Sequence, residues 1–205
     1  PALAFGIWNV GEQHSIAFGL DMTFIEKVWF GFLKVLPLLI VSYVVGLGIE
    51  FTVAQMRGHE VNEGFLVSGM LIPLVVPADI PLWMVAVATA FAVIFGKEVF
   101  GGTGMNIWNP ALIARAFLFF AYPSKLSGDT VWYSNCVDGF TGPTALSLAG
   151  TGDYTTYSIM DCIIGNIPGS IGETSVIAIG LGAILLLVTG IASWKTMFSV
   201  IAGGA

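Results

Sequence analysis

The run from 28 to 49, VWFGFLKVLPLLIVSYVVGLGI, limits what this chain can fold into more than any other stretch. Its 22 residues include one charge, Lys34, and one proline, Pro37. A helix of about 20 apolar residues crosses a hydrocarbon core about 30 Å thick, so the run predicts a membrane-spanning helix. The composition of the whole chain supports a membrane protein, because 56% of its residues are hydrophobic and only 10% are charged. Soluble domains contain about 25% charged residues. We expect an all-α, polytopic integral membrane protein.

The other apolar runs are shorter or interrupted. Residues 65–76 and 82–96 are each marginal for a span, and the prolines between them predict a helical hairpin. Pro110 opens an apolar segment that ends near Tyr122 and is too short to cross the membrane, so we expect a broken half-helix there. Residues 176–194 carry no charge and predict a continuous span.

Two polar segments complete the predicted single membrane domain, which covers 1–205. Residues 1–26 show no sustained period, and we interpret them as an extramembrane loop with at most one short helix. Residues 123–160 predict a long extramembrane loop. The chain begins without Met and ends soon after a new apolar run starts at Trp194, so we interpret it as a fragment of a longer polypeptide.

Charge and cysteine content exclude several function classes. The net charge of −6 argues against nucleic acid as a partner, because phosphate binding needs clustered Lys and Arg. Cys136 and Cys162 match neither a disulfide framework nor a metal-ligand spacing. His59 lies in a polar loop without partners at ligand spacing, so we expect no metal site.

The basic residues also predict an orientation in the membrane. Arg57, Lys97 and Lys195 border spans on one side, whereas the loop 123–160 contains one Lys and three Asp. Cytoplasmic segments carry an excess of Lys and Arg, so the first side is predicted to be cytoplasmic and the loop to lie outside. Lys27 falls on the opposite side from the other basic residues.

Two glycine-rich breaks, 101–110 and 165–175, interrupt the helical pattern. Non-helical backbone at membrane depth must be buried in protein or line a cavity, because lipid cannot bond its polar groups. Such breaks present helix ends to ions or cofactors, although glycines there also mark tight packing or a hinge. Gly102, Asn106 and Asn109 in the first break are therefore candidate cofactor contacts, since two amides in an apolar setting need partners.

Three ionisable residues near these segments need an explanation. Glu50 ends the first span and either reaches the interface or faces a cavity as an ion or proton ligand. Glu173 either caps the following helix or binds an ion such as sodium. Arg115 lies inside the half-helix, where a guanidinium requires an anionic partner, either a protein carboxylate or a cofactor phosphate.

The polar stretch 134–148, SNCVDGFTGPTALSL, contains the most specific motif in the chain. Chemistry alone indicates a glycine turn with hydroxyls that bond the backbone. Its core nevertheless resembles the D-x-x-[ST]-G-A-T motif on which membrane flavoproteins of the NqrB/RnfD family carry FMN. The matching residues are Asp138, Thr141, Gly142 and Thr144, and Pro143 departs from the usual Ala.

Further stretches resemble the same family in the same order along the chain. They are HEVNEG at 59–64, KEVFGGTG at 97–104 with Asn106 and Asn109, RAFLFFAYP at 115–123, SGDTVW at 127–132 and NIPGSIGE at 166–173. The HEVNEG stretch favours the NqrB branch over RnfD. Proteins of the NqrB branch belong to sodium-translocating NADH:quinone oxidoreductases.

The resemblance implies an electron-transfer subunit of a redox-driven sodium pump, inactive alone. Thr144 would carry FMN through a phosphoester made by a flavin transferase, and Asn106 and Asn109 would contact a non-covalent riboflavin. Gly46 and Glu50 match a region tied to ubiquinone and sodium (Na+) handling. No residue is assigned a catalytic role.

The resemblance also implies the setting of the protein. Its partners would be the other subunits of the complex, a quinone, Na+ and membrane lipid, and its location would be the bacterial inner membrane with the FMN loop on the periplasmic side. The chain would form half of an inverted-repeat helical bundle.

Three other functions remain open from the sequence. One is an RnfD-type subunit of a related ferredoxin:NAD oxidoreductase. A second is a non-redox channel or carrier whose broken helices line a pore. A third is an assembly scaffold whose glycines only pack helices against partner subunits.

Overall fold

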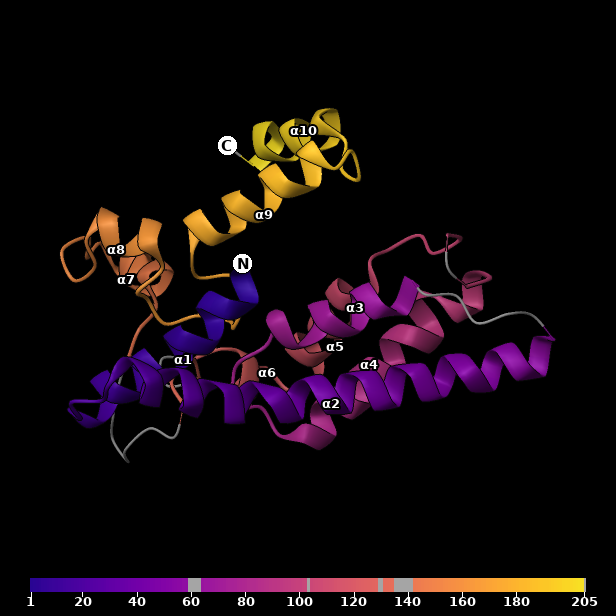
Figure 1. The fold of residues 1–205 in the computed structure, drawn as a ribbon, viewed down its shortest axis with the longest axis horizontal. Coiled ribbons are helices and arrows are strands. Elements are labelled where there is room, and N and C mark those ends of the chain that lie inside the picture. The colour runs from indigo at the N-terminus through magenta and orange to yellow at the C-terminus, as the bar shows by residue number, and fades with distance from the viewer. Residues whose placement is uncertain (59–63, 103, 129–130, 135–141, 205) are drawn as a thin grey trace.

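The computed structural model describes residues 1–58, 64–102, 104–128, 131–134 and 142–204, and every regular element in those ranges is a helix (Figure 1). The long helix α2, Phe24–Arg57, runs along one side of the molecule. Helices α3, Gly64–Leu74, and α4, Leu82–Gly96, lie beside it, and α5, Pro110–Ala121, packs against both of them. The expected all-α fold is confirmed for the described residues.

Helix α2 is longer than the apolar run that predicted it. It starts at a capping box in which the Glu26 carboxylate accepts from the Thr23 backbone N–H, and it contains Pro37 without ending there. It continues past Glu50 to Arg57, because no Gly or Pro follows until Gly58, which ends the helix with φ of 69°. A charge that marks the end of an apolar run does not end a helix.

The short helix expected from Pro110 is confirmed, but the expected hairpin is not, because α3 and α4 pack against α2 and α5 rather than against each other. Helices α3 and α4 flank the prolyl turn at 75–81, and α4 packs against both α2 and α5. After the short 3-10 helix η1, Glu98–Phe100, the glycine-rich break leads to α5, whose 12 residues begin at Pro110. The core between these helices is apolar and comprises Val35, Leu38, Ile72, Val76, Val85, Ala88, Ala92, Ala111, Ala114 and Leu118.

The interpretation of 1–26 as a loop with at most one short helix was wrong. Helix α1, Ala2–Phe18, has 17 residues and packs along the first part of α2. The approach is close because both helices have glycine at the contact. A Cβ on Gly31 would lie 1.8 Å from the Ile7 carbonyl oxygen, and one on Gly11 would lie 2.1 Å from that of Lys27.

The polar region 123–160 contains short helices in its described parts. These are α6, Pro123–Leu126, and α7, Ala145–Thr151, and the segment leads into α8, Ile159–Ile164. Asp153 closes the turn between α7 and α8. Its carboxylate accepts from the Thr155 backbone N–H and from the hydroxyls of Thr156 and Thr155, and these bonds lower its pKa to about 2.

The expected continuous span over 176–194 was also wrong. Helix α9, Val176–Val188, has 13 residues, and a turn separates it from α10, Trp194–Gly204. Gly190 adopts a left-handed φ of 71°, and the N–H groups of Gly190 and Ile191 bond carbonyls of the last turn of α9. These bonds satisfy the helix end and stop the helix. Figure 1 shows α9 and α10 extending away from the other helices.

In the described part of the chain, two helical segments are long and apolar enough to cross a membrane, namely Phe24–Arg57 and Leu82–Phe100. Three shorter helices there, α3, α5 and α9, are also apolar. The fold therefore combines long helices with short apolar ones that leave irregular backbone between them.

Gly31→Ala is expected to destabilise the protein, because the new Cβ cannot fit against the Ile7 carbonyl. We expect a loss of about 1–3 kcal/mol from overpacking at this contact. Gly48→Ala in the same helix is the matched control, since nothing lies within 4 Å of its Cβ position and alanine favours a helix by about 0.5–1 kcal/mol. Thermal unfolding of the full-length protein in detergent tests the pair. Equal melting temperatures for both variants would contradict the close α1–α2 packing.

Candidate functional site

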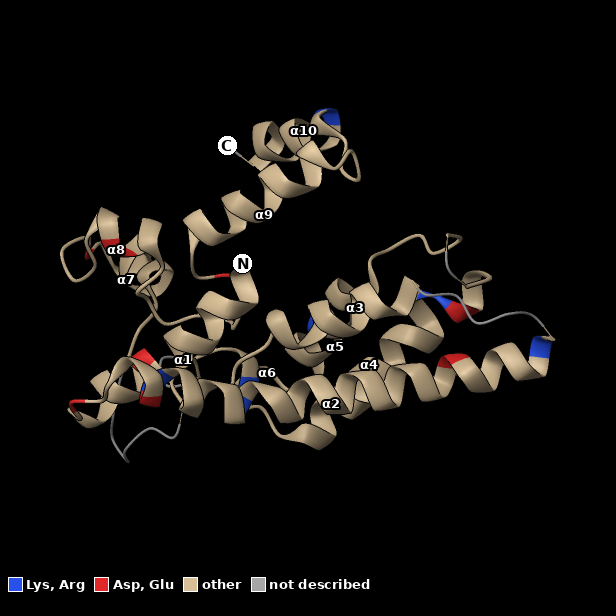
Figure 2. Cartoon of the chain, in the orientation of Figure 1, with Lys and Arg blue, Asp and Glu red and all other residues tan. Residues whose placement is uncertain are grey.

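Charged residues are grouped near both ends of α2, and others lie on α8 and α10 (Figure 2). Near the end of α2, Arg57 lies 3.9 Å from Glu98, and Lys97 binds Glu50. Near the start of α2, Lys27 binds Glu12 at 2.6 Å and Lys34 binds Asp79 at 2.7 Å. Arg57 and Lys97 thus lie in one region, whereas Lys195, which was predicted on the same side, belongs to α10, which lies apart from both regions (Figure 1).

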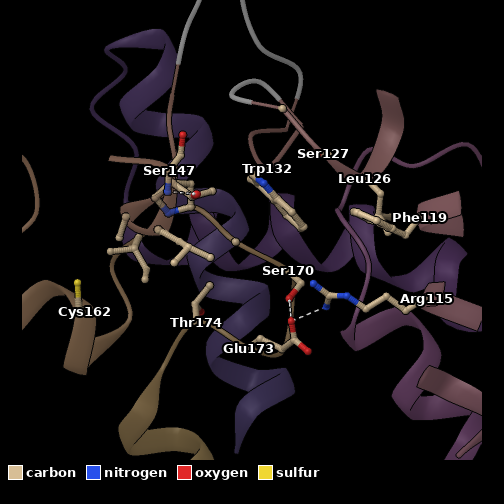
Figure 3. Close-up of a pocket in the computed structure, with 17 residues that line it drawn as sticks. Arg115, Phe119, Leu126, Ser127, Trp132, Ser147, Cys162, Ser170, Glu173 and Thr174 are labelled. Atoms are coloured by element: carbon tan, nitrogen blue, oxygen red, sulfur yellow. Dashed lines mark hydrogen bonds and ion pairs between the residues drawn. The ribbon is translucent and has the colours of Figure 1, made fainter. Parts of the chain in front are cut away.

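A cavity of about 810 Å³ lies beside α5 and α7 (Figure 3). The irregular segment that follows α8 forms one wall, and the start of α7 forms another. This "flavin-motif cavity" is lined by Arg115, Phe119, Leu126, Ser127, Gly128, Trp132, Thr144, Ala145, Leu146, Ser147, Cys162, Ile167, Pro168, Gly169, Ser170, Glu173 and Thr174. It brings together Thr144, Arg115 and Glu173, which are far apart in sequence.

Thr144 is the N-cap of α7. Its hydroxyl oxygen accepts from the Ser147 backbone N–H at 3.2 Å, which leaves the hydroxyl proton unused by the cap. Gly142, two residues earlier, packs against a ring: a Cβ there would lie 2.0 Å from Tyr133. The other two residues of the predicted motif, Asp138 and Thr141, lie outside the described residues.

Arg115 binds a protein carboxylate, which was one of its two predicted partners. Its guanidinium donates to Glu173 Oε2 at 2.6 Å and to the Val75 carbonyl at 3.0 Å. Ser170 also donates to Glu173, and Figure 3 shows Arg115 extending toward both residues. Glu173 does not cap α9, because Ser175 is the N-cap and accepts from the Ala178 N–H.

The cavity has the size and chemistry that a flavin needs. Pockets for cofactors range over about 300–1,000 Å³ and combine apolar walls with a few polar groups. Here Phe119, Leu126 and Trp132 supply apolar and aromatic surface, whereas Arg115 supplies a cation. Hydroxyls of Ser127, Ser147, Ser170 and Thr174 add hydrogen-bonding groups. The residues present fit an FMN attached at Thr144.

Asn106 and Asn109 lie together in a second, smaller cavity of about 270 Å³, which Lys97 also lines. The Asn109 side chain accepts from the Ala111 N–H and caps α5, and Asn106 donates to the Trp108 carbonyl. The Asn109 NH2 group and the Asn106 side-chain oxygen therefore remain available for a ligand. Gly102 has φ of 94° and does not line this cavity.

Glu50 is buried, with 4% of its surface exposed, and its carboxylate accepts from the Lys97 ammonium, which is equally buried. It does not reach the interface, which was one of the two alternatives. Gly46, one turn earlier, lies against Phe65, since a Cβ there would be 1.8 Å from the ring. Among the described residues, no group of three acidic, His or Cys side chains could hold a metal ion.

Comparison with known proteins agrees with this architecture. The sequence profile of the NQR2, RnfD, RnfE family matches residues 1–205. The chain belongs to this family. The sequence-based assignment is thereby confirmed, and membership together with the apolar helices identifies a membrane protein.

The relatives within the family come from one kind of complex. The chain is 45% identical to the B subunit of the Na(+)-translocating NADH-quinone reductase of Chromohalobacter salexigens, over 100% of the chain and 56% of the relative. It is 43% identical to the corresponding B subunits of Ectopseudomonas mendocina and Azotobacter vinelandii, over 99% of the chain and 57% of each relative. The chain thus spans a little over half the length of these relatives.

Several residues around the flavin-motif cavity were missed by sequence reasoning. Trp132, Ser147, Ser170 and Thr174 line it but belong to no predicted site. Trp132 and Ser170 do lie in stretches that carry the family resemblance, so position within those stretches was a usable signal.

Lys97→Met is expected to destabilise the protein, because it leaves the Glu50 carboxylate buried without its ammonium partner. Breaking a buried pair on one side costs about 3–5 kcal/mol. Combining Lys97→Met with Glu50→Gln should recover most of that loss, since no unpaired charge remains. Lys125→Met, at an exposed position, is the control. Thermal unfolding of the full-length protein in detergent measures all three, and an unchanged melting temperature for Lys97→Met would refute a stabilising pair.

Proposed function

We propose that the chain is part of the electron-transfer subunit of a redox-driven sodium pump, with FMN bound covalently to Thr144. The observation that carries the proposal is that Thr144, from the flavin-like motif, opens onto a cavity of about 810 Å³ lined by aromatic side chains and by the Arg115–Glu173 ion pair. The resemblance of the chain to B subunits of Na(+)-translocating NADH-quinone reductases supports the same function.

The chain's own residues would hold the cofactor from several sides. The Thr144 hydroxyl would form the phosphoester, and its oxygen can still accept the Ser147 N–H after esterification. Arg115 would add positive charge, although Glu173 neutralises part of it. Trp132 would offer an aromatic face for the flavin ring. FMN, once bound, supplies one- and two-electron redox chemistry that no side chain provides.

The second cavity is the proposed site for a riboflavin contact. Asn106 and Asn109 line it, and their unused amide groups suit the polar edge of a flavin ring. Its volume of about 270 Å³ is small for such a ring. Residues from the longer polypeptide or from partner subunits of the complex would therefore complete the site.

Gly46 and Glu50 remain the proposed quinone and sodium region, with Glu173 as a further sodium candidate. Glu50 and Lys97 form a buried pair beside the second cavity, which Lys97 lines. A sodium ion that reached Glu50 would compete with the Lys97 ammonium for the same carboxylate.

We further propose a periplasmic location for the flavin-motif loop in a bacterial inner membrane. Ser134, directly before the motif, donates to Asp79, which binds Lys34 near the start of α2. Arg57 and Lys97 lie near the other end of that helix. Basic residues lie at both ends of α2, with Lys27 and Lys34 near its start, so the periplasmic location of the motif is proposed from the family resemblance. The remaining length of the full protein would supply the other half of an inverted repeat.

Thr144→Val is expected to abolish covalent flavin, because valine has no hydroxyl to form the phosphoester. The full-length protein is expressed with a flavin transferase, denatured, separated on a gel and viewed under ultraviolet light. The parent protein should fluoresce, and Thr144→Val should not.

Thr151→Val is the matched control, since Thr151 is an exposed residue at the other end of α7. It should retain full fluorescence. A fluorescent band that survives Thr144→Val, or a parent protein without one, would exclude Thr144 as the attachment residue.

A further inference from the structure

We infer that Asn9 is a positioning residue for the flavin-motif cavity. It orients the Thr174 hydroxyl so that this hydroxyl donates a hydrogen bond to the bound flavin. The inference rests on the proposed function, because it assigns a role toward the flavin in that cavity.

The contact between α1 and the cavity wall consists of buried amides. Asn9 Nδ2 donates to the Ile167 carbonyl at 3.1 Å and to Thr174 Oγ1 at 3.4 Å. Gln13, one turn later, donates to Asn9 Oδ1 at 3.3 Å and to Asn166 Oδ1 at 3.4 Å. Asn9, Gln13 and Thr174 are at most 5% exposed. Water therefore cannot replace these bonds, and each is expensive to lose.

The backbone fixes which way the Asn9 amide points. A carbonyl oxygen can only accept, so the group that faces the Ile167 carbonyl must be the NH2 of Asn9. The same NH2 then faces Thr174 Oγ1, and Asn9 Oδ1 faces the Gln13 donor. Asn9 therefore acts on Thr174 as a donor.

This arrangement leaves the Thr174 proton for the cavity. A hydroxyl has one proton to donate and two lone pairs that accept. One lone pair of Thr174 accepts from Asn9, and among the described residues no protein acceptor receives the Thr174 proton. Thr174 also lines the flavin-motif cavity. A flavin acceptor in that cavity is the partner that this hydroxyl lacks.

The wall that carries Thr174 is held by two contacts besides the Asn9–Ile167 hydrogen bond, so a change at Asn9 leaves the backbone of the wall anchored at two other points. On one side, the Gly6 backbone touches the wall, since a Cβ there would lie 1.8 Å from the Ile171 carbonyl oxygen. On the other, Gly172 N–H donates to the Leu74 carbonyl at 2.8 Å.

The test uses Asn9→Asp in the full-length protein, flavinylated in membranes and purified. Aspartate has nearly the shape of asparagine, and the titration is run at alkaline pH, where the buried carboxyl is ionised and only accepts. Thr174 would then donate to it and withdraw its proton from the flavin. Thr174→Val removes the hydroxyl with little change of shape, whereas Thr174→Ser retains it. Ser15→Ala is the control on α1, because Ser15 is buried but bonds only the Leu20 carbonyl.

The measurement is a spectroelectrochemical titration of the flavins. The redox transition that is present in the parent protein and absent in Thr144→Val belongs to the flavin of this cavity. A donated hydrogen bond favours the electron-rich reduced flavin, so its loss lowers the midpoint potential. Asn9→Asp and Thr174→Val should each lower the ratio of reduced to oxidised flavin at a fixed potential by about two- to tenfold. Thr174→Ser and Ser15→Ala should leave it unchanged.

The outcomes separate the positioning role from the proposed function. A parent protein without Thr144-dependent flavin would overturn both. Thr144-dependent flavin whose potential is unmoved in Thr174→Val, or moved equally in Thr174→Ser, would overturn only the positioning role. If Asn9→Asp does not assemble, Asn9→Ala removes the donor without burying a charge and should shift the potential in the same direction. An unshifted potential in Asn9→Ala would then exclude Asn9.

Discussion

The structure depends on how irregular backbone between short apolar helices obtains its hydrogen bonds. The main acceptors are the end of α3 and the start of the prolyl turn, because the carbonyls of residues 74–76 all accept from the segment 165–175 or from Arg115. Leu74 accepts from Gly172 N–H, Val75 from the Arg115 guanidinium and Val76 from Ile171 N–H. In a bilayer no water could take their place. The same bonds fix the wall of the flavin-motif cavity. The contacts that satisfy the irregular backbone therefore also build the site.

The apolar helices α2 and α4 could be predicted from the sequence, and the shorter apolar helices could be predicted only where a proline or glycine marks an end. Pro110 gave the start of α5 correctly. Gly190 ends α9 with left-handed geometry, but a glycine in an apolar run is also compatible with a continuing helix, so the run was predicted as one span. Residue type alone does not reveal which glycine adopts positive φ.

Helix α1 shows why part of the site was not predictable. Its buried residues include Gly6, Asn9, Gly11 and Gln13, which are typical of loops in a sequence taken alone. They suit a helix here because glycines allow close approach and amides bond the exposed backbone of the wall. That wall is more than 150 residues away in the chain. In contrast, Thr144 was found because it lies in a family motif. Arg115 was found because a charged residue inside an apolar helix needs a partner. Both signals can be recognised from the local sequence.

Helix α5 links the two cavities, which explains the use of a half-helix. Pro110 at its start lines the smaller cavity, and Arg115 lines the larger one. Five residues of helix rise only about 7.5 Å, so the two cavities open on the same short element. A full-length span in this position would extend through the break that carries Asn106 and Asn109. The broken helix therefore allows two ligands to sit close together within one bundle, as electron transfer between two flavins would require.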